Sequence, residues 1–289
     1  MPELPEVETV RRTLAPVLVG ATIVAALRGE HPEDILLDPW QFFARRVRRR
    51  RIVSLDRRGK FLALRGDDGT RLLVHLGMTG ELRLAHPGVP PERHCHLALV
   101  LRSERPLPAV LADRRQRFLL RYQDVRRFGR VRLLDPAGWE ALCARLGPEP
   151  LDPDLDAPTL WQRLRTRRSS IKTALLDQSL LAGIGNIYAD EALFRAGLHP
   201  ARRCDTLSRA DVERLLAELR TVLSEAIEAA GTTIRDYRDG TGRPGSYQFR
   251  LRVYGKPAGT PCPRCDGPLE RVRLAGRSST YCPRCQPPS

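Results

Sequence analysis

Lysine is nearly missing from this chain of 289 residues: it occurs only at Lys60, Lys172 and Lys256, and every other strong base is arginine. A bias of this kind can come from genome composition alone. The three lysines still mark positions of interest, because a lysine side chain can lose its proton and an arginine side chain cannot.

Long apolar runs are missing as well. No stretch approaches the roughly 20 apolar residues that cross a membrane, and the start of the chain lacks the basic-then-apolar layout of a signal peptide. Four of the seven cysteines form Cys-x-x-Cys pairs, which favours a reducing compartment and a metal over a disulfide framework. The sequence therefore predicts a cytoplasmic protein with no membrane partner.

The charge balance is strongly basic. The formal net charge is +15, and the basic residues are spread along the chain instead of forming a tail. A folded basic surface suits a polyanionic partner, most simply nucleic acid. The length is enough for about two domains.

The first half of the chain predicts one helix followed by strands. Apolar residues recur at helical spacing over residues 5–19, and Gly20 stands where a C-cap belongs. Residues 22–135 contain short β-prone runs separated by turn signals, which indicates a β-sandwich or barrel. The clearest of these runs are 52–55, 61–64, 72–74 and 96–101.

The second half predicts helices and a small terminal module. Ser208 is expected to cap a long helix with Asp211 in a capping box, and Gly231 to end it. Glycines and a proline in 236–248 predict a mobile loop. The expected divisions are an N-terminal domain at 1–135, a proline-rich linker at 136–153, a helical domain at 154–235, the loop at 236–248 and a terminal module at 249–289.

The terminal module carries the spacing of a structural zinc site. Two Cys-Pro-Arg-Cys knuckles lie about as far apart as those of four-cysteine zinc modules. Four thiolates leave no open coordination position, so one Zn²⁺ here would be structural, and its binding would supply the folding energy of so short a segment. Redox pairs or disulfides are the disfavoured alternatives. The four expected ligands are Cys262, Cys265, Cys282 and Cys285.

The chain begins Met1-Pro2-Glu3. Removal of Met1 would leave Pro2 with a free secondary amine, and an α-amine has a pKa of about 7.7–8.0. A useful fraction is then neutral and able to attack carbon, with Glu3 beside it to shuttle a proton. The plain alternative is that Pro2 and Pro5 only open the first helix.

Together these features resemble the bacterial formamidopyrimidine-DNA glycosylase family, and the likeness runs through the whole chain in order. Its relative, the endonuclease VIII branch, usually has glycine at the position of Leu4. The segments that carry the resemblance are 1–8, 58–62, 75–80, 126–129, 146–151, 183–191 and the zinc module.

The resemblance implies a multidomain α+β fold: an N-terminal β-sandwich with a leading helix, a helix–two-turn–helix domain and a C-terminal zinc-finger β-hairpin, with DNA between the lobes. It implies a monomeric bacterial enzyme of base-excision repair, nucleoid-associated when bound to DNA. Such an enzyme removes oxidised purines such as 8-oxoguanine and formamidopyrimidines from double-stranded DNA and cleaves the resulting abasic strand.

For catalysis, the resemblance implies that the Pro2 amine attacks C1′ of the damaged nucleotide and that Glu3 protonates the opening sugar. Glu6, one helical turn on, would position the amine or a water; equally, it is a carboxylate favoured by the helix dipole. Lys60 would contact phosphate near the lesion, where a solvated surface lysine is the alternative.

For DNA binding, the resemblance implies that His75 contacts phosphate. It also implies that Met78 fills the gap left by the extruded nucleotide, that Arg126 pairs with the orphaned base and that Phe128 wedges the neighbouring step. Methionine and phenylalanine are usually core residues, but the glycines around Met78 and Phe128 favour exposed turns. Val125 stands where the family commonly has proline.

In the second half, Asn186 would bind phosphate at the start of a helix or act as a simple N-cap, and Arg277 of the zinc module would grip phosphates at the lesion. No catalytic role is expected for Lys172, because Thr173-Ala174 replace the family's usual Pro-Trp. The loop 236–248 lies where the family holds the everted base.

Three alternatives remain. An endonuclease VIII-like enzyme would prefer oxidised pyrimidines, but Leu4 and the long loop argue against it. A non-enzymatic zinc protein that binds damaged DNA would be expected to lack Pro2 or Glu3, and both are present. A basic zinc protein with no DNA role does not explain the ordered match.

Overall fold

The computed structural model describes residues 2–288, which fold into two compact units. The first unit contains the chain up to Ala144 together with Ala230–Ser246; the second contains Arg145–Ala229 and the chain from Tyr247 onward. Within the described range, no helix is both long and apolar enough to cross a membrane.

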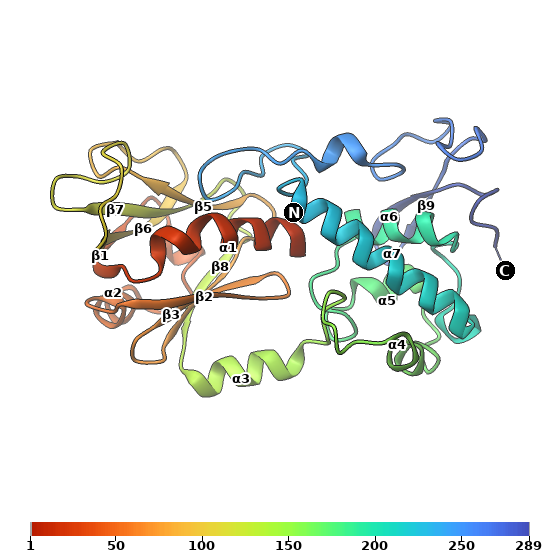
Figure 1. The fold of residues 1–289 in the computed structure, drawn as a ribbon, viewed down its shortest axis with the longest axis horizontal. Helices are drawn as coiled ribbons and strands as arrows, with labels where there is room; N and C mark the ends of the chain where they lie inside the picture. Colours follow the sequence, from red (N-terminus) through yellow and green to blue (C-terminus); the bar gives the residue numbers. More distant parts are fainter. Residues whose placement is uncertain (1, 289) are drawn as a thin grey trace. The chain divides into compact units, whose positions relative to one another are not determined.

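The first unit is a sandwich of two antiparallel four-stranded sheets (Figure 1), with strand orders β1-β6-β7-β5 and β2-β3-β4-β8. Val10 and Leu14 of the first helix share one buried cluster with Leu64 of one sheet and Leu99 of the other, so the helix completes the core of the sandwich. The elements are α1 (Leu4–Leu18), β1 (Thr22–Arg28), η1 (Pro32–Asp34), α2 (Trp40–Val47), β2 (Ile52–Arg58), β3 (Phe61–Gly66), β4 (Arg71–His75), β5 (Gly80–Ala85), β6 (Cys95–Arg102), β7 (Arg117–Asp124), β8 (Arg130–Leu134) and α3 (Pro136–Arg145).

The predicted β-sandwich with a leading helix is confirmed. Helix α1 covers the expected interval and is followed by Gly20 with φ of +92°, a conformation that suits glycine at a helix end. The four predicted runs lie in β2, β3, β4 and β6. Helix α2 was not predicted, because its arginine-rich sequence turns only Phe43 and Val47 into the core.

The linker predicted at 136–153 is corrected in its first part, where α3 forms. Pro136 opens this helix, as proline suits a first turn. Trp139 and Leu142 of α3 then pack on Ala63 and Leu73, on the outer face of the sheet β2-β3-β4-β8. The helix forms because it covers apolar strand residues that would otherwise face water.

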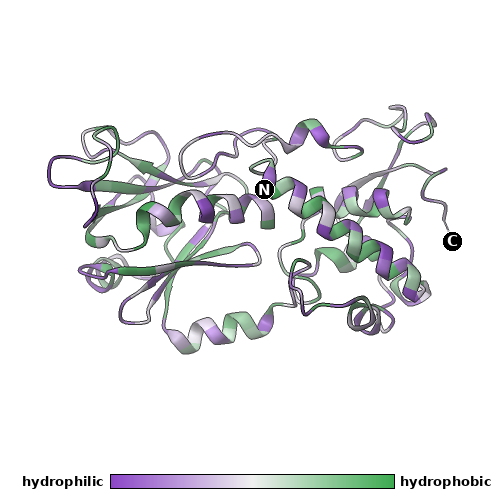
Figure 2. Cartoon of the chain, in the orientation of Figure 1, coloured by the Kyte–Doolittle hydropathy of each residue, from purple (hydrophilic) through white to green (hydrophobic). Residues whose placement is uncertain are grey.

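The second unit is built around α7, a helix of 20 residues that begins after Ser208. The predicted capping box is present: Ser208 Oγ accepts from Asp211 N at 3.1 Å, and Ser208 N donates to Asp211 Oδ2 at 3.0 Å. Figure 2 shows apolar and polar residues alternating along α7, as expected for a helix with one buried face. The helices of this unit are α4 (Ala157–Leu164), α5 (Ile171–Leu176), α6 (Asn186–Ala196), η2 (Cys204–Thr206), α7 (Arg209–Glu228) and η3 (Tyr247–Arg250).

The chain ends in a β-hairpin of β9 (Glu270–Leu274) and β10 (Arg277–Tyr281), paired antiparallel. Gly276 has φ of +76° at the turn between them. Two cysteine knuckles flank the hairpin, and the predicted zinc-finger β-hairpin is thereby confirmed.

Candidate functional site

The first turn of α1 places Pro2 and Glu3 beside a buried carboxylate. Glu3 is the N-cap residue, and its N–H donates to Glu6 Oε2 at 2.8 Å. The other oxygen of Glu6, Oε1, accepts from Thr232 N at 2.7 Å. Pro2, Glu3 and Glu6 are all buried. Pro5 lies within the first helical turn, whereas Pro2 lies before the cap, so the role of helix opening fits Pro5 and not Pro2.

Residues 230–246 lie against α1 within the first unit. Tyr237 Oη donates to Glu6 O at 3.2 Å, and Gly240 N donates to Thr13 Oγ1 at 3.1 Å. A Cβ on Gly240 would lie 2.5 Å from the Leu14 side chain, so only glycine allows this approach. Tyr237 and Gly240, in the interval predicted as a loop, are thus hydrogen-bonded to two turns of α1, the helix that follows Pro2 and Glu3. The contacts of Thr232 and Tyr237 carried no local sequence signal.

Lys60 lies at the turn between β2 and β3, after Gly59 with φ of +55°, and is 8 % exposed. Glu8 of α1 fixes this turn: Arg57 Nε donates to Glu8 Oε2 at 3.0 Å and Arg57 Nη1 to Gly59 O at 3.1 Å. Burial alone would raise the pKa of Glu8, but hydrogen bonds from Arg11, Arg12 and Arg57 outweigh it and lower the pKa to about 2. Sequence reasoning missed this function of Glu8.

His75 ends β4 directly opposite Phe61, and the two rings lie 5.1 Å apart. Burial first, then the charges of Lys60 and Arg130, lower the pKa of His75 to about 4. The imidazole is therefore neutral at pH 7. A phosphate contact by His75 would use a neutral N–H donor.

Asp124 organises the two turns that carry the predicted DNA-contacting side chains. It is fully buried, and its Oδ1 accepts from Thr79 Oγ1 at 2.5 Å and from Arg126 N at 3.2 Å. Its Oδ2 accepts from Gly129 N at 2.8 Å. A Cβ on Gly77 would lie 2.5 Å from Gly129 N, which shows how closely the two turns approach.

Three of the predicted side chains therefore lie on adjoining, exposed turns of the first unit. Met78 is 37 % exposed and Phe128 51 % exposed, so the alternative of core residues is wrong. The Arg126 guanidinium lies 4.7 Å from the centre of the Phe128 ring. Val125, at the position where the family commonly has proline, is also exposed.

In the second unit, Asn186 is the first residue of α6, and Gly185 is the N-cap. The alternative that Asn186 is the N-cap is therefore wrong by one residue. Its Nδ2 instead donates to Ser278 O of β10 at 3.1 Å. Asn186 joins the start of α6 to the strand that begins at Arg277.

Lys172 is fully buried beneath the same helix start. Its Nζ donates to Asn186 O at 3.0 Å and to Asp190 Oδ1 at 2.5 Å. Asp190 Oδ2 accepts from Thr280 N at 3.3 Å. Burial raises the pKa of Asp190 and the ammonium of Lys172 opposes that rise. This ion pair supports the attachment of β10 to α6.

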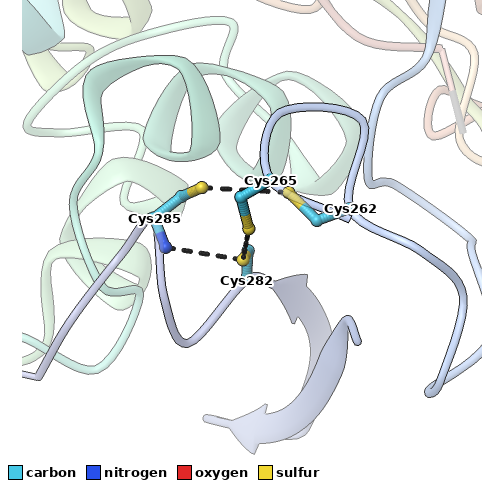
Figure 3. A group of neighbouring side chains, drawn as sticks. All are labelled: Cys262, Cys265, Cys282 and Cys285. Carbon is cyan, nitrogen blue, oxygen red and sulfur yellow. Dashed lines mark hydrogen bonds between the residues drawn. The ribbon is translucent and has the colours of Figure 1, made fainter. Parts of the chain in front are cut away.

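The four predicted zinc ligands lie together (Figure 3), with all their sulfur atoms within 4.8 Å of one another. The Sγ atoms of Cys262 and Cys285 are 3.9 Å apart, and those of Cys265 and Cys282 are 3.5 Å apart. Tetrahedral zinc with Zn–S bonds of about 2.3 Å requires sulfur separations of about 3.8 Å. The four thiols thus form a site for one structural zinc ion. Arg277 lies exposed at the start of β10.

Three domain families match the chain. The family described as formamidopyrimidine-DNA glycosylase N-terminal domain matches residues 1–131, and the formamidopyrimidine-DNA glycosylase H2TH domain matches 146–238. A zinc finger found in FPG and IleRS matches 259–288. These ranges fall on the sandwich, the helical part and the zinc hairpin.

Full-length relatives agree with this assignment. The formamidopyrimidine-DNA glycosylase of Thermomicrobium roseum is 76 % identical over 99 % of both chains, and that of Chloroflexus aggregans is 46 % identical over 99 % of this chain and 98 % of its own. A solved structure of a Lactococcus lactis FPG mutant with Fapy-dG-containing DNA is 35 % identical, with a TM-score of 0.88 over 99 % of this chain and all of that one. The MutM (FPG) protein of Thermus thermophilus is 40 % identical, with a TM-score of 0.84 over the full length of both. The chain belongs to the formamidopyrimidine-DNA glycosylase family.

Proposed function

We propose that this chain is a bifunctional DNA glycosylase and abasic-site lyase of base-excision repair, which removes oxidised purines such as 8-oxoguanine and formamidopyrimidines from duplex DNA. The observation that carries the proposal is the arrangement of Pro2 and Glu3 ahead of α1, beside a carboxylate that holds the Glu3 backbone. The names of the full-length relatives and the damaged DNA in the solved neighbours support the same substrate class.

The chemistry begins at Pro2 once Met1 is removed. The secondary amine attacks C1′, the C1′–N bond to the base breaks, and the base leaves with a proton. Glu3 protonates the sugar ring oxygen as the ring opens, so that the nitrogen lone pair can form an iminium with C1′. Extrusion of the damaged nucleotide from the duplex is required for this attack.

The iminium then serves as an electron sink. Loss of a C2′ proton expels the 3′ phosphate by β-elimination, and a second elimination expels the 5′ phosphate. Glu6 keeps the first turn in place through its bonds to the Glu3 and Thr232 N–H groups. Lys60 and neutral His75 bind phosphate near the lesion.

The remaining residues bind the strand around the extruded nucleotide. Met78 fills the vacated space, Arg126 pairs with the orphaned base and Phe128 wedges the adjacent step, as apolar side chains do in kinked DNA. Asn186 and Arg277 bind phosphates from the second unit. The zinc ion, when bound, holds the knuckles around the hairpin, and Cys262, Cys265, Cys282 and Cys285 are its ligands.

The protein acts as a monomer on damaged double-stranded DNA, in the bacterial cytoplasm and at the nucleoid. The divisions 1–135, 154–235 and 249–289 serve as catalytic, helical DNA-binding and zinc-finger domains. The loop 236–248 contacts the everted base, and the rest of 136–153, after α3, links the first two.

Borohydride trapping tests the proposal directly. A duplex with one 8-oxoguanine opposite cytosine is incubated with the protein and borohydride, and the adduct is mapped by peptide sequencing. We expect a covalent adduct at Pro2 and none at the side-chain amines of Lys60 or Lys256. A protein shown by mass to lack Met1 that binds the lesion but gives no adduct would contradict the mechanism.

The Lys60→Arg variant is the matched control, because it keeps the charge and removes the primary amine. Excision from this duplex, compared with excision from a duplex that carries an oxidised pyrimidine, separates this proposal from the endonuclease VIII-like alternative. Preferred excision of the pyrimidine would favour that alternative.

A further inference from the structure

An unusual run of arginines lies in the first unit, outside the proposed DNA contacts. Six of the seven residues from 45 to 51 are arginine. The run covers the end of α2 and the approach to β2. Because α2 buries Phe43 and Val47, the side chains of Arg45 and Arg46 remain on its exposed face.

These arginines border a surface cavity of about 700 Å³. Arg45, Arg46 and Arg50 line it from α2 and the segment after it, and Arg132 lines it from β8. Small-ligand sites typically have volumes of about 300–1,000 Å³. The cavity is therefore large enough for a nucleotide.

Two of the four guanidinium groups are held in place by one carboxylate. Asp68 Oδ2 lies 3.3 Å from Arg46 Nη2 and 3.1 Å from Arg50 Nε. Arg46 Nη2 also donates to Thr70 Oγ1 at 3.1 Å. In contrast, Arg45 and Arg132 form no ion pair with any carboxylate in residues 2–288.

Three carboxylates offset most of this charge: four guanidinium groups against Asp38, Asp68 and Asp135 leave a net charge of about +1 at the cavity. Asp38 Oδ2 accepts from Leu133 N at 2.7 Å and Asp135 Oδ1 from Gly138 N at 2.7 Å, and these bonds hold both carboxylates in place without neutralising them. An anion bound at the cavity would pair with Arg45 and Arg132, whose charges no carboxylate in the described residues balances directly. Arginine is well suited to bind phosphate because its planar fork donates two hydrogen bonds at once.

An aromatic ring completes the cavity. Phe42 lines it and is 44 % exposed, although phenylalanine is usually buried. Exposed aromatic rings beside basic residues are typical of surfaces that bind single-stranded nucleic acid, since any base can stack on them.

The cavity lies far from the proposed catalytic side of the same sheet. Arg71 pairs with Leu134 at the cavity end of β4 and β8, and His75 pairs with Arg130 at the other end. Four residues of strand separate the two ends by about 13 Å. Figure 1 also shows α2 at the end of the first unit opposite the start of α1.

We propose that this cavity is a second nucleotide-binding site, which holds one nucleotide of a single DNA strand outside the glycosylase site. Arg45 and Arg132 bind the flanking phosphates, and Phe42 stacks on the base. The inference goes beyond the proposed function and does not depend on it, because no lesion or catalytic group takes part.

Photo-cross-linking tests this site. A short single-stranded oligonucleotide carrying 5-iododeoxyuridine is irradiated with the full-length protein, and the cross-linked peptides are mapped. We expect an adduct at Phe42. The variant Arg45→Ser/Arg132→Ser should reduce the yield of this adduct about tenfold. It should also lower the slope of log affinity for the oligonucleotide against log salt concentration by about 1.4, since each lost phosphate contact on a single strand accounts for about 0.7.

The matched control is Arg114→Ser/Arg115→Ser, which removes the same charge from exposed residues between β6 and β7. We expect the control to keep the Phe42 adduct within about twofold of the wild-type yield. No adduct at Phe42, or an equal loss in the control, would overturn the proposal. Both variants should excise 8-oxoguanine from a short duplex normally, which distinguishes a failure of this site from a failure of the proposed function.

Two competition arms identify the ligand. Excess thymidine monophosphate should compete with the oligonucleotide only weakly, because a strand supplies two phosphates and a free nucleotide supplies one. Equal competition at equal phosphate concentration would show a site for free nucleotides instead. Loss of the adduct to anionic lipid vesicles but not to unlabelled DNA would also refute the strand proposal.

Discussion

The two units hold their candidate functional residues by different means. In the first, buried carboxylates do so: Glu6 accepts from the N–H groups of Glu3 and Thr232, and Asp124 accepts from those of Arg126 and Gly129. In the second, Arg277 stands on a two-stranded hairpin whose buried cluster is small and rich in cysteine. The first arrangement needs only the chain, whereas the hairpin of the second needs a metal in addition to the Lys172–Asp190 ion pair that attaches β10 to α6. We therefore expect that the proposed catalysis and part of the proposed DNA binding can be disabled separately.

Removal of one zinc ligand should have the largest effect. It tests whether the hairpin of the second unit depends on a metal while the first unit does not. We expect Cys282→Ser to lose the metal and unfold the hairpin, because structural zinc supplies about 10–16 kcal/mol of binding energy in zinc-finger peptides. Lesion binding should fall at least 100-fold, while the sandwich stays folded. Zinc content, limited proteolysis and binding measure this; Cys143→Ser, which changes a cysteine outside the cluster, serves as the control. A variant that keeps the zinc and the hairpin would contradict the assignment.

Glu3→Gln tests the proposed catalytic residues of the first unit. This variant loses the proton donor but keeps a side chain of the same shape, so base excision should fall by about 10²–10⁴-fold. Binding to the lesion should change little. Single-turnover excision and equilibrium binding are measured together, with Glu30→Gln on the surface as the control. Normal turnover by Glu3→Gln would count against the mechanism.

The dependence of the first unit on charge predicts a loss of stability in acid. Hydrogen bonds from arginines outweigh burial and lower the pKa of Glu8 from 4.5 to about 2 in the folded protein. The stabilisation is therefore complete above about pH 4.5 and is lost as the pH falls towards 2. Such a difference corresponds to about 3 kcal/mol.

Glu8→Gln should remove this contribution, so that its free energy of unfolding changes less between pH 7 and pH 3 than that of the wild type. Urea unfolding at a series of pH values measures the difference. Glu104→Gln, at an exposed carboxylate, is the matched control. Parallel curves for the wild type and Glu8→Gln would show that Glu8 does not stabilise the fold through its charge.

The smallest effect is expected from Arg277→Ala, which sharpens the comparison by removing one contact without unfolding the hairpin. Loss of one phosphate contact should lower the slope of log affinity against log salt by about 0.9 on duplex DNA. Binding should weaken several-fold at low salt. Titrations at several salt concentrations measure the slope, with Arg114→Ala as the control; an unchanged slope would remove Arg277 from the phosphate contacts.

Local patterns predicted the parts of this structure that local forces determine. Helix α1 and its glycine end, four strands, the capped helix α7 and the four-cysteine cluster all depend on spacing over a few residues. Helices α2 and α3 were missed because few of their residues face the core, and packing decides their form.

The candidate site shows the same division. The residue types at Pro2, Met78 and Phe128 could be singled out from the sequence, and the exposure of the last two agrees with it. The bond between Glu6 and Thr232 joins residues 226 positions apart, and no local pattern announces it. Glu8 and Asp124 likewise act through partners that only the fold brings near.

The contact between the turns of Gly77 and Gly129 also limits how this protein can be redesigned. A Cβ on Gly129 would lie 1.7 Å from the Tyr122 hydroxyl, and a Cβ on Gly77 would meet the backbone of Gly129. A library aimed at changing the base contact proposed for Arg126 should therefore keep both glycines fixed. Diversity belongs at Met78 and Arg126, whose side chains leave the same turns without supporting them.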